Sequence, residues 1–218
     1  MSHINFRPWI GKNYQSTGYK GKRILVLGES HYCHELKEGC ICHSLCTKEK
    51  MQSDCFSLTE DVINDFVYSY CGIGDKQYEQ TFLCFERAVI GKEATQEERE
   101  EFWEGVVFYN YIQFAQDGPR RPIKSEYRAE SELAFKELLE EYMPDYIIVW
   151  GARLYNYWLP DWGGNGSVLQ IRDNAKTDVW TYTIKGKRIS AIKVHHPSSP
   201  SGKSWNYWHE FYMKFLNL

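Results

Sequence analysis

Four segments of the chain are rich in apolar residues and are predicted to be strands. Three of them are almost continuously apolar, which is typical of parallel strands covered on both faces. Before the fourth, Lys185-Gly186 favours a hairpin turn, so 178–184 is expected to pair antiparallel with 188–194. The four strands are 23–28 (RILVLG), 106–114 (VVFYNYIQF), 146–151 (YIIVWG) and 188–196 (RISAIKVHH).

Between these strands, apolar residues recur at helical spacing. Ser57 with Glu60 and Thr95 with Glu98 have the spacing of capping boxes, and Gly91 is a natural helix end. The predicted helices are 57–70, 78–91, 95–106, 125–143 and 204–216.

The alternation of strands and helices predicts an α/β fold, which we expect to be a three-layer α/β/α sandwich around a central, mainly parallel four-stranded sheet. No internal repeat or low-complexity linker divides the chain, so 1–218 is expected to be a single domain. The polar, Cys-rich stretch 33–56 is expected to be a loop insertion. The Gly-rich stretch 159–167 is expected to be a mobile loop over a pocket.

Composition narrows the class of protein. The net charge of −3 gives no overall basic bias of the kind that many nucleic-acid binders carry, although it is compatible with one basic face. No stretch approaches 18 apolar residues, and the first residues, MSHINFRPWIGK, contain no apolar signal core. We therefore expect a cytoplasmic protein with no membrane partner, in which the seven cysteines are reduced thiols or metal ligands.

Polar residues follow the ends of the predicted strands. The first strand runs directly into Gly28-Glu29-Ser30-His31-Tyr32, the second carries Asn110, and the fourth ends in His195-His196-Pro197-Ser198-Ser199. Ligands of open parallel sheets bind at the carboxyl ends of the strands. These segments together therefore predict a site at one edge of the sheet, whereas each one alone is more typical of an ordinary loop.

In order and strand context, three of these motifs resemble the uracil-DNA glycosylase superfamily. They are the turn at residues 28–32, Asn110 at the end of a second apolar strand, and His196-Pro197-Ser198 after the last strand. The resemblance spans roughly residues 22–202. It implies a uracil-DNA glycosylase-like fold and a DNA partner, and an enzyme that flips a uracil or another damaged base into a pocket and hydrolyses its N-glycosidic bond, with no required cofactor.

The resemblance also implies roles for individual residues. Asn110 would read the base edge, because an amide offers both a donor and an acceptor, and Tyr32 would stack on the base. His196 would donate to a base oxygen as negative charge develops on the leaving base. The implied catalytic residues are Glu29, Ser30 and His196, and the implied substrate-binding residues are Gly28, Tyr32, Asn110, His195, Ser198 and Ser199, with the two serines on phosphates.

The sequence departs from the family pattern at two positions. Ser30 stands where the best-known members have an Asp that orients the water, and His31 replaces the usual Pro; Glu29 is the nearest carboxylate. One alternative is therefore a non-catalytic relative that binds a nucleic acid or nucleobase. A second is a Ser30-dependent esterase-like hydrolase, although no carboxylate lies three residues before either His195 or His196.

A basic segment follows the second strand. In the glycosylase hypothesis Arg120, Arg121 and Lys124 contact backbone phosphates beside the pocket. The alternative is a solvated loop at the start of a helix.

The cysteines have two interpretations. Cys40, Cys42, Cys46 and Cys55 could hold zinc, but their spacing fits none of the common zinc-finger patterns. A metal-free loop of thiols fits the sequence better, and a metal or redox module is a third class of function. Cys71 and Cys84 lie in apolar helical patterns and are expected to be buried.

Overall fold

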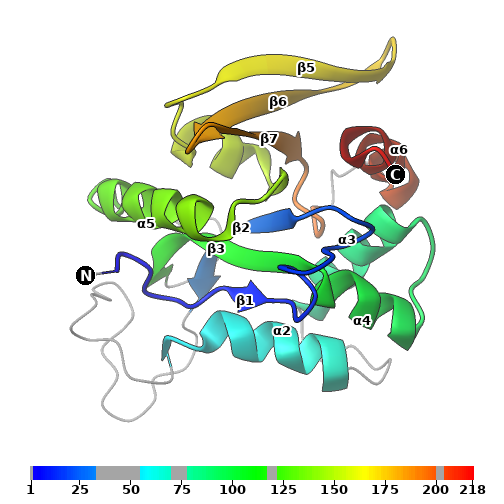
Figure 1. Ribbon diagram of the computed structural model, residues 1–218, viewed down its shortest axis with the longest axis horizontal. Helices are drawn as coiled ribbons and strands as arrows, with labels where there is room; N and C mark the ends of the chain where they lie inside the picture. Colours follow the sequence, from blue (N-terminus) through cyan, green and yellow to red (C-terminus); the bar gives the residue numbers. More distant parts are fainter. Residues whose placement is uncertain (1, 33–54, 70–77, 117–121, 200–203) are drawn as a thin grey trace.

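The computed structural model describes residues 2–32, 55–69, 78–116, 122–199 and 204–218. It is an α/β structure, as predicted, built on a mixed seven-stranded sheet of order β1-β3-β2-β4-β7-β6-β5 (Figure 1). The strands are β1 (Trp9–Ile10), β2 (Ile24–Tyr32), β3 (Val106–Gln116), β4 (Tyr146–Trp150), β5 (Asn165–Arg172), β6 (Ala175–Ile184) and β7 (Lys187–Val194). The helices are α2 (Leu58–Ser69), α3 (Glu79–Ile90), α4 (Gln96–Glu104), α5 (Tyr127–Tyr142), α6 (Trp205–Leu216) and the π-helix η3 (Leu154–Trp158).

The predicted four-stranded sheet is wrong in extent. The four predicted strands are β2, β3, β4 and β7, and they form a parallel centre of order β3-β2-β4-β7. Antiparallel strands extend this centre on both sides, with β1 on β3 and the β6–β5 pair on β7. The sequence pattern missed β1 because it has only two residues, and missed β5 because most of its side chains are exposed.

Two apolar cores lie on opposite faces of the sheet. The first, which we call the α3-side core, contains Phe108, Trp150 and buried residues of α2, α3, α4 and α6. The second, the α5-side core, contains Tyr109, Val149 and buried residues of α5 and η3. Alternate residues of each central strand therefore serve different cores, which explains why these strands are almost continuously apolar.

Several predicted helix ends are confirmed. Thr95 and Glu98 form the expected capping box at the start of α4. Gly91 ends α3 in the left-handed conformation, with φ of 91°. At the end of α5 the same role falls to Met143, with φ of 45°.

Three local expectations are wrong. β2 and β3 continue past residues 28 and 114, to Tyr32 and Gln116, so residues 28–32 are strand and Asn110 lies within β3. Residues 165–167 of the expected mobile loop belong to β5, and a Cβ on Gly164 would lie 1.6 Å from the Thr181 carbonyl oxygen, so this segment packs closely on β6. Cys84 is exposed rather than buried.

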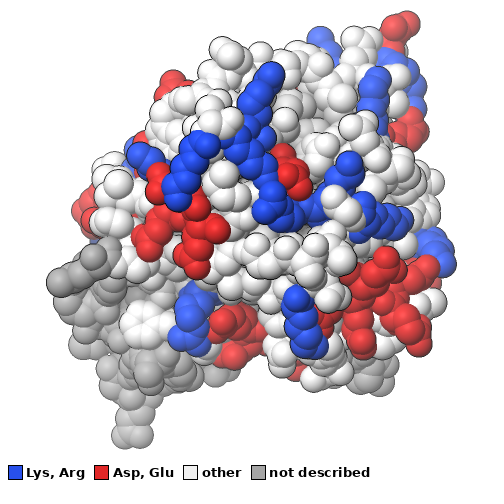
Figure 2. All heavy atoms as spheres, viewed as in Figure 1, with Lys and Arg blue, Asp and Glu red and all other residues white. Residues whose placement is uncertain are grey.

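Charge is unevenly distributed over the surface. On the face drawn in Figure 2, Lys and Arg side chains form an oblique band, while Asp and Glu gather in separate clusters. The net charge of −3 therefore conceals local basic surface. Within the described residues, no helix is long and apolar enough to cross a membrane.

A buried ion pair joins α3 to α4. The Arg99 guanidinium donates from Nε and Nη2 to Glu86 at 3.1 and 2.7 Å, and the two side chains are only 7 % and 2 % exposed. Burial raises the pKa of Glu86, and the hydrogen bond from Arg99 opposes that rise. The Trp103 indole N–H also donates to Glu86, at 3.3 Å.

We expect Arg99→Met to lower the free energy of unfolding by about 3–5 kcal/mol, because it leaves the Glu86 carboxylate buried without its cation. Urea denaturation at pH 7 measures this loss. The double variant Arg99→Met/Glu86→Leu should recover most of it, since a well-packed apolar pair can replace a buried ion pair. A double variant less stable than Arg99→Met would contradict this account.

Candidate functional site

The site expected at the carboxyl edge of the sheet can be traced strand by strand. Gly28 on β2 pairs in register with Asn110 on β3. Each residue follows, two positions later, a member of the α3-side core (Val26 and Phe108), so both face that side. Trp150, the last residue of β4, belongs to the same core.

The Asn110 side chain lies directly against the Gly28 backbone. A Cβ atom on residue 28 would be 2.2 Å from Asn110 Oδ1 and 3.2 Å from Phe108 Cζ. Any larger residue would displace the amide, so glycine at this position allows Asn110 to lie across β2. The family resemblance placed Gly28 and Asn110 in one substrate-binding set, and the structure brings these two residues into contact.

His31 supports the same amide from the other direction. Its ring is buried, and Asn110 Nδ2 lies 3.4 Å from Nδ1 and 3.3 Å from Nε2. The ring also shares a 2.9 Å hydrogen bond with the Thr59 hydroxyl of α2, and it packs 4.2 Å from the Phe6 ring. Burial lowers the pKa of His31 to about 3, so the imidazole is neutral at physiological pH.

Trp150 connects this group to His196. Its ring centroid is 5.2 Å from that of Phe108 and 6.1 Å from that of His196. The backbone also brings the segments together, because the Gly151 N–H donates to the Val194 carbonyl at 3.0 Å. His196 itself is exposed.

Local hydrogen bonds orient the His196 ring. The Ser198 backbone N–H donates to His196 Nδ1 at 3.4 Å, and the Ser198 hydroxyl lies 2.9 Å from the same nitrogen. The Ser199 N–H donates to the His196 carbonyl at 2.8 Å, which closes the turn. Because Nδ1 accepts, the neutral ring carries its proton on Nε2.

Glu29 lies on a different part of the rim. Residue 29 alternates with Gly28, so it faces the side that carries α5 and η3. There it forms a two-point ion pair with Arg153, the residue preceding η3, with Nε at 2.9 Å from Oε2 and Nη2 bonded to Oε1. This pairing raises the pKa of Arg153.

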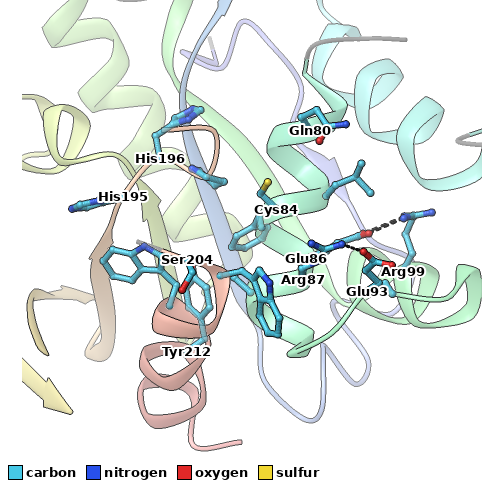
Figure 3. A pocket seen from close by; sticks show the side chains of 17 residues that line it. Gln80, Cys84, Glu86, Arg87, Glu93, Arg99, His195, His196, Ser204 and Tyr212 are labelled. Atoms are coloured by element: carbon cyan, nitrogen blue, oxygen red, sulfur yellow. Dashed lines mark hydrogen bonds and ion pairs between the residues drawn. The ribbon is translucent and has the colours of Figure 1, made fainter. Parts of the chain in front are cut away.

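A cavity of about 530 Å³ lies beside His196, between α3 and α6 (Figure 3). His195 and His196 line one side of it, and Cys84 faces it from α3. Further lining comes from Trp208, whose ring centroid is 5.2 Å from that of His195. Gly28, Tyr32 and Asn110 are not among its lining residues, so this cavity is adjacent to the Asn110 group rather than continuous with it.

The remaining predicted site residues are spread around the rim or lie outside the description. Ser30 pairs with Ile112 in the sheet, and Tyr32, 36 % exposed, ends β2. Lys124 lies before α5, 3.7 Å from Glu126 and 5.8 Å from the centroid of the Tyr127 ring. Arg120, Arg121, Cys40, Cys42, Cys46 and Cys71 lie outside the described residues.

Of the four predicted zinc ligands, the structure describes only Cys55. Cys55 packs beside Phe6 and Ala115 in a small apolar cluster. In the part of the chain that the structure describes, no group of three His, Cys, Asp or Glu residues could hold a metal ion. The predicted ligands Cys40, Cys42 and Cys46 lie outside the described residues.

Comparisons with protein-family models and with curated proteins assign no family to the chain. The sequence matches no model of a known protein family, and a search of curated proteins found no match. The function is therefore argued from the site itself.

Sequence reasoning assigned no role to three contributors to the site, although it placed Trp150 and Arg153 at the end of the third strand. Arg153 comes three residues after the third strand ends at Trp150, and this position is the sequence feature that places it at the rim. Trp150 looks like an ordinary strand residue in the sequence. Thr59 lies 28 positions from His31, and only the fold brings the two together.

We expect stability to fall between pH 7 and pH 5 because of His31. Its pKa is about 3 when folded and ordinarily about 6.5, so the unfolded chain binds the extra proton in this range and gains stability from it. The loss at pH 5 is about 2 kcal/mol relative to pH 7. Urea midpoints at both pH values should show a smaller loss for His31→Gln, whose side chain does not titrate. Equal losses in both proteins would contradict the assignment.

We expect Gly28→Ala to destabilise the protein by about 1–3 kcal/mol, because the new methyl group overlaps the Asn110 amide. Chemical denaturation measures the change. Adding Asn110→Ala should restore part of the loss by removing the overlap. If the two substitutions are simply additive in a double-mutant cycle, the close approach does not restrict residue 28.

Proposed function

We propose that this protein is a divergent DNA glycosylase-like enzyme that recognises a flipped uracil or other damaged base between Asn110 and His196. The observation that carries the proposal is the arrangement of the Asn110 amide and the His196 imidazole on the α3 side of the sheet, connected through Phe108 and Trp150. β2 and β4 lie between the two parent strands, which gives a separation of about 14 Å at the backbone. In the proposed complex the base lies between these two side chains.

The polar groups suit the edges of a pyrimidine-like base. The Asn110 amide, held by Gly28 and His31, offers a donor and an acceptor at a fixed position. The Nε2–H of His196, set by the Ser198 contacts at Nδ1, would donate to a base oxygen. Preorganised donors of this kind act where charge develops during reaction.

The proposed reaction is hydrolysis at the sugar. Water attacks C1′, the C1′–N bond breaks, and the base leaves with the bonding electron pair while His196 stabilises the charge on its oxygen. The proton lost by the water passes to solvent or to the departing base. Ser199 and Lys124, at opposite parts of the rim, would contact flanking phosphates.

A non-catalytic base-binding protein is the second candidate, and one contact favours it. Glu29, the carboxylate nearest to the position of the missing Asp, is held by Arg153 on the α5 side. Both oxygens of this carboxylate accept from the guanidinium, which leaves fewer lone pairs to orient a water. The esterase alternative has less support, because β4 lies between the strand that carries Ser30 and the strand that precedes His196.

The test is base release from single- and double-stranded oligonucleotides that contain uracil, hypoxanthine or xanthine. We expect Asn110→Ala and His196→Ala each to reduce release by about 100-fold, the scale seen when one preorganised donor is removed. His3→Ala is the matched control, since the His3 side chain is 41 % exposed and pairs with Glu130 rather than with a residue of the proposed site.

The outcomes separate the candidates. Comparable release by His3→Ala and wild type, with large losses in the two rim variants, supports the glycosylase. Binding of damaged DNA without release, weakened by Asn110→Ala, supports the non-catalytic candidate and overturns the enzyme. Normal release by either rim variant would overturn the proposed site.

A further inference from the structure

A second surface lies on the α5 side of the same rim. Tyr157, in the π-helix η3, is 67 % exposed, the largest fraction among the large apolar or aromatic side chains that the structure describes. π-Helical segments are rare and frequently occur at functional sites. One exposed ring alone is ordinary on a protein surface, so what lies beside it decides whether this one marks a site.

Arg128 lies beside this π-helix. Its guanidinium carbon is 4.7 Å from the centroid of the Trp158 ring, and Nη2 donates to the Tyr157 carbonyl. Within the described residues no carboxylate forms an ion pair with it, in contrast to Arg153 with Glu29 and Lys124 with Glu126. The Arg128 side chain is therefore held in place by an aromatic ring and a carbonyl, and among the described residues no ion pair occupies its charge.

Topology puts these two residues next to the proposed site. η3 begins four residues after the end of β4, and its first turn follows Arg153, which bonds Glu29 of β2. Arg153 is also close enough to Tyr32 for the two groups to interact electrostatically. Arg128 lies in the first turn of α5, the helix that packs on β3 and covers this face of the sheet.

We propose that Tyr157 and Arg128 form a nucleotide platform that binds single-stranded nucleic acid, with one base stacked on the Tyr157 ring and a phosphate at the Arg128 guanidinium. An exposed ring offers its face only to a base that is unstacked from its neighbours, which favours single strands over duplex. The platform rests on the proposed function for its place in the reaction, where it would hold nucleotides that flank the flipped base. Its binding step needs no excision and can be measured alone.

The experiment is fluorescence anisotropy with a labelled oligothymidylate, which contains no damaged base, and with a duplex of equal length. We expect tighter binding of the single strand. Tyr157→Ala should weaken it by about 5- to 100-fold, the range for losing one base–aromatic stack, and Tyr157→Phe should bind as wild type. Arg128→Ala should reduce the slope of log affinity against log salt by about 0.7, the value for one phosphate on a single strand.

Two matched controls lie away from the platform. Tyr68→Ala removes a 39 % exposed aromatic ring from α2, the helix that packs in the α3-side core, and Arg172→Ala removes an exposed cation that pairs with Glu210. Both should bind the single strand as wild type does. Thermal melting of every variant identifies any loss that comes from unfolding.

The results distinguish this inference from the glycosylase proposal. Tyr157-dependent binding of oligothymidylate supports the platform even if no base is ever released. Unchanged affinity in folded Tyr157→Ala overturns it even if uracil is excised. Tighter binding of the duplex than of the single strand also overturns it.

Discussion

The structure depends on the parallel register of β3, β2, β4 and β7, whose buried residues supply both apolar cores. Ile24, Leu25, Val26 and Leu27 of β2 are each at most 1 % exposed, and they divide alternately between the two cores. Such a strand cannot carry a polar side chain until it passes the helices that cover it. Polar chemistry is therefore concentrated at the carboxyl edge, where Gly28, Glu29 and Asn110 appear in register.

Alternation along the strands then separates this edge into two surfaces. Gly28 and Asn110 face the side of α3 and α6, whereas Glu29 faces the side of α5 and η3. The same period of two that builds the cores thus places the Asn110 amide and the Glu29 carboxylate on opposite faces. Arg153 completes the second surface by binding Glu29, and neutral His31 completes the first by supporting Asn110. Protonation of His31 would place a charge in a buried position at a large desolvation cost, so its imidazole stays neutral.

The central architecture could be predicted from sequence because its signals are local. Continuous apolar runs identified the four parallel strands, and the Thr95–Glu98 box and Gly91 identified helix ends. The edge strand β5 carries no apolar run, since its side chains are mostly exposed, and β1 is too short to show a period. The sequence pattern predicted a buried Cys84 because this residue lies between Phe82 and Phe85. Those two side chains are buried, whereas Cys84 is exposed. Contacts such as Thr59 with His31 or Arg153 with Glu29 join residues far apart in sequence, and no local pattern encodes them.

The two faces of the rim also constrain the path of any nucleic-acid strand that contacts both proposed sites. A base held between Asn110 and His196 lies on the α3 side, while Tyr157 and Arg128 lie on the α5 side. A duplex is too stiff to place neighbouring nucleotides on both, because smooth bending over so short a length is costly. A single strand can turn across the edge at Gly151, whose φ of 103° brings the chain sharply from β4 into η3 and leaves no side chain there. The separation of the two surfaces therefore makes an unpaired strand, rather than a duplex, the expected ligand if both proposed sites act together.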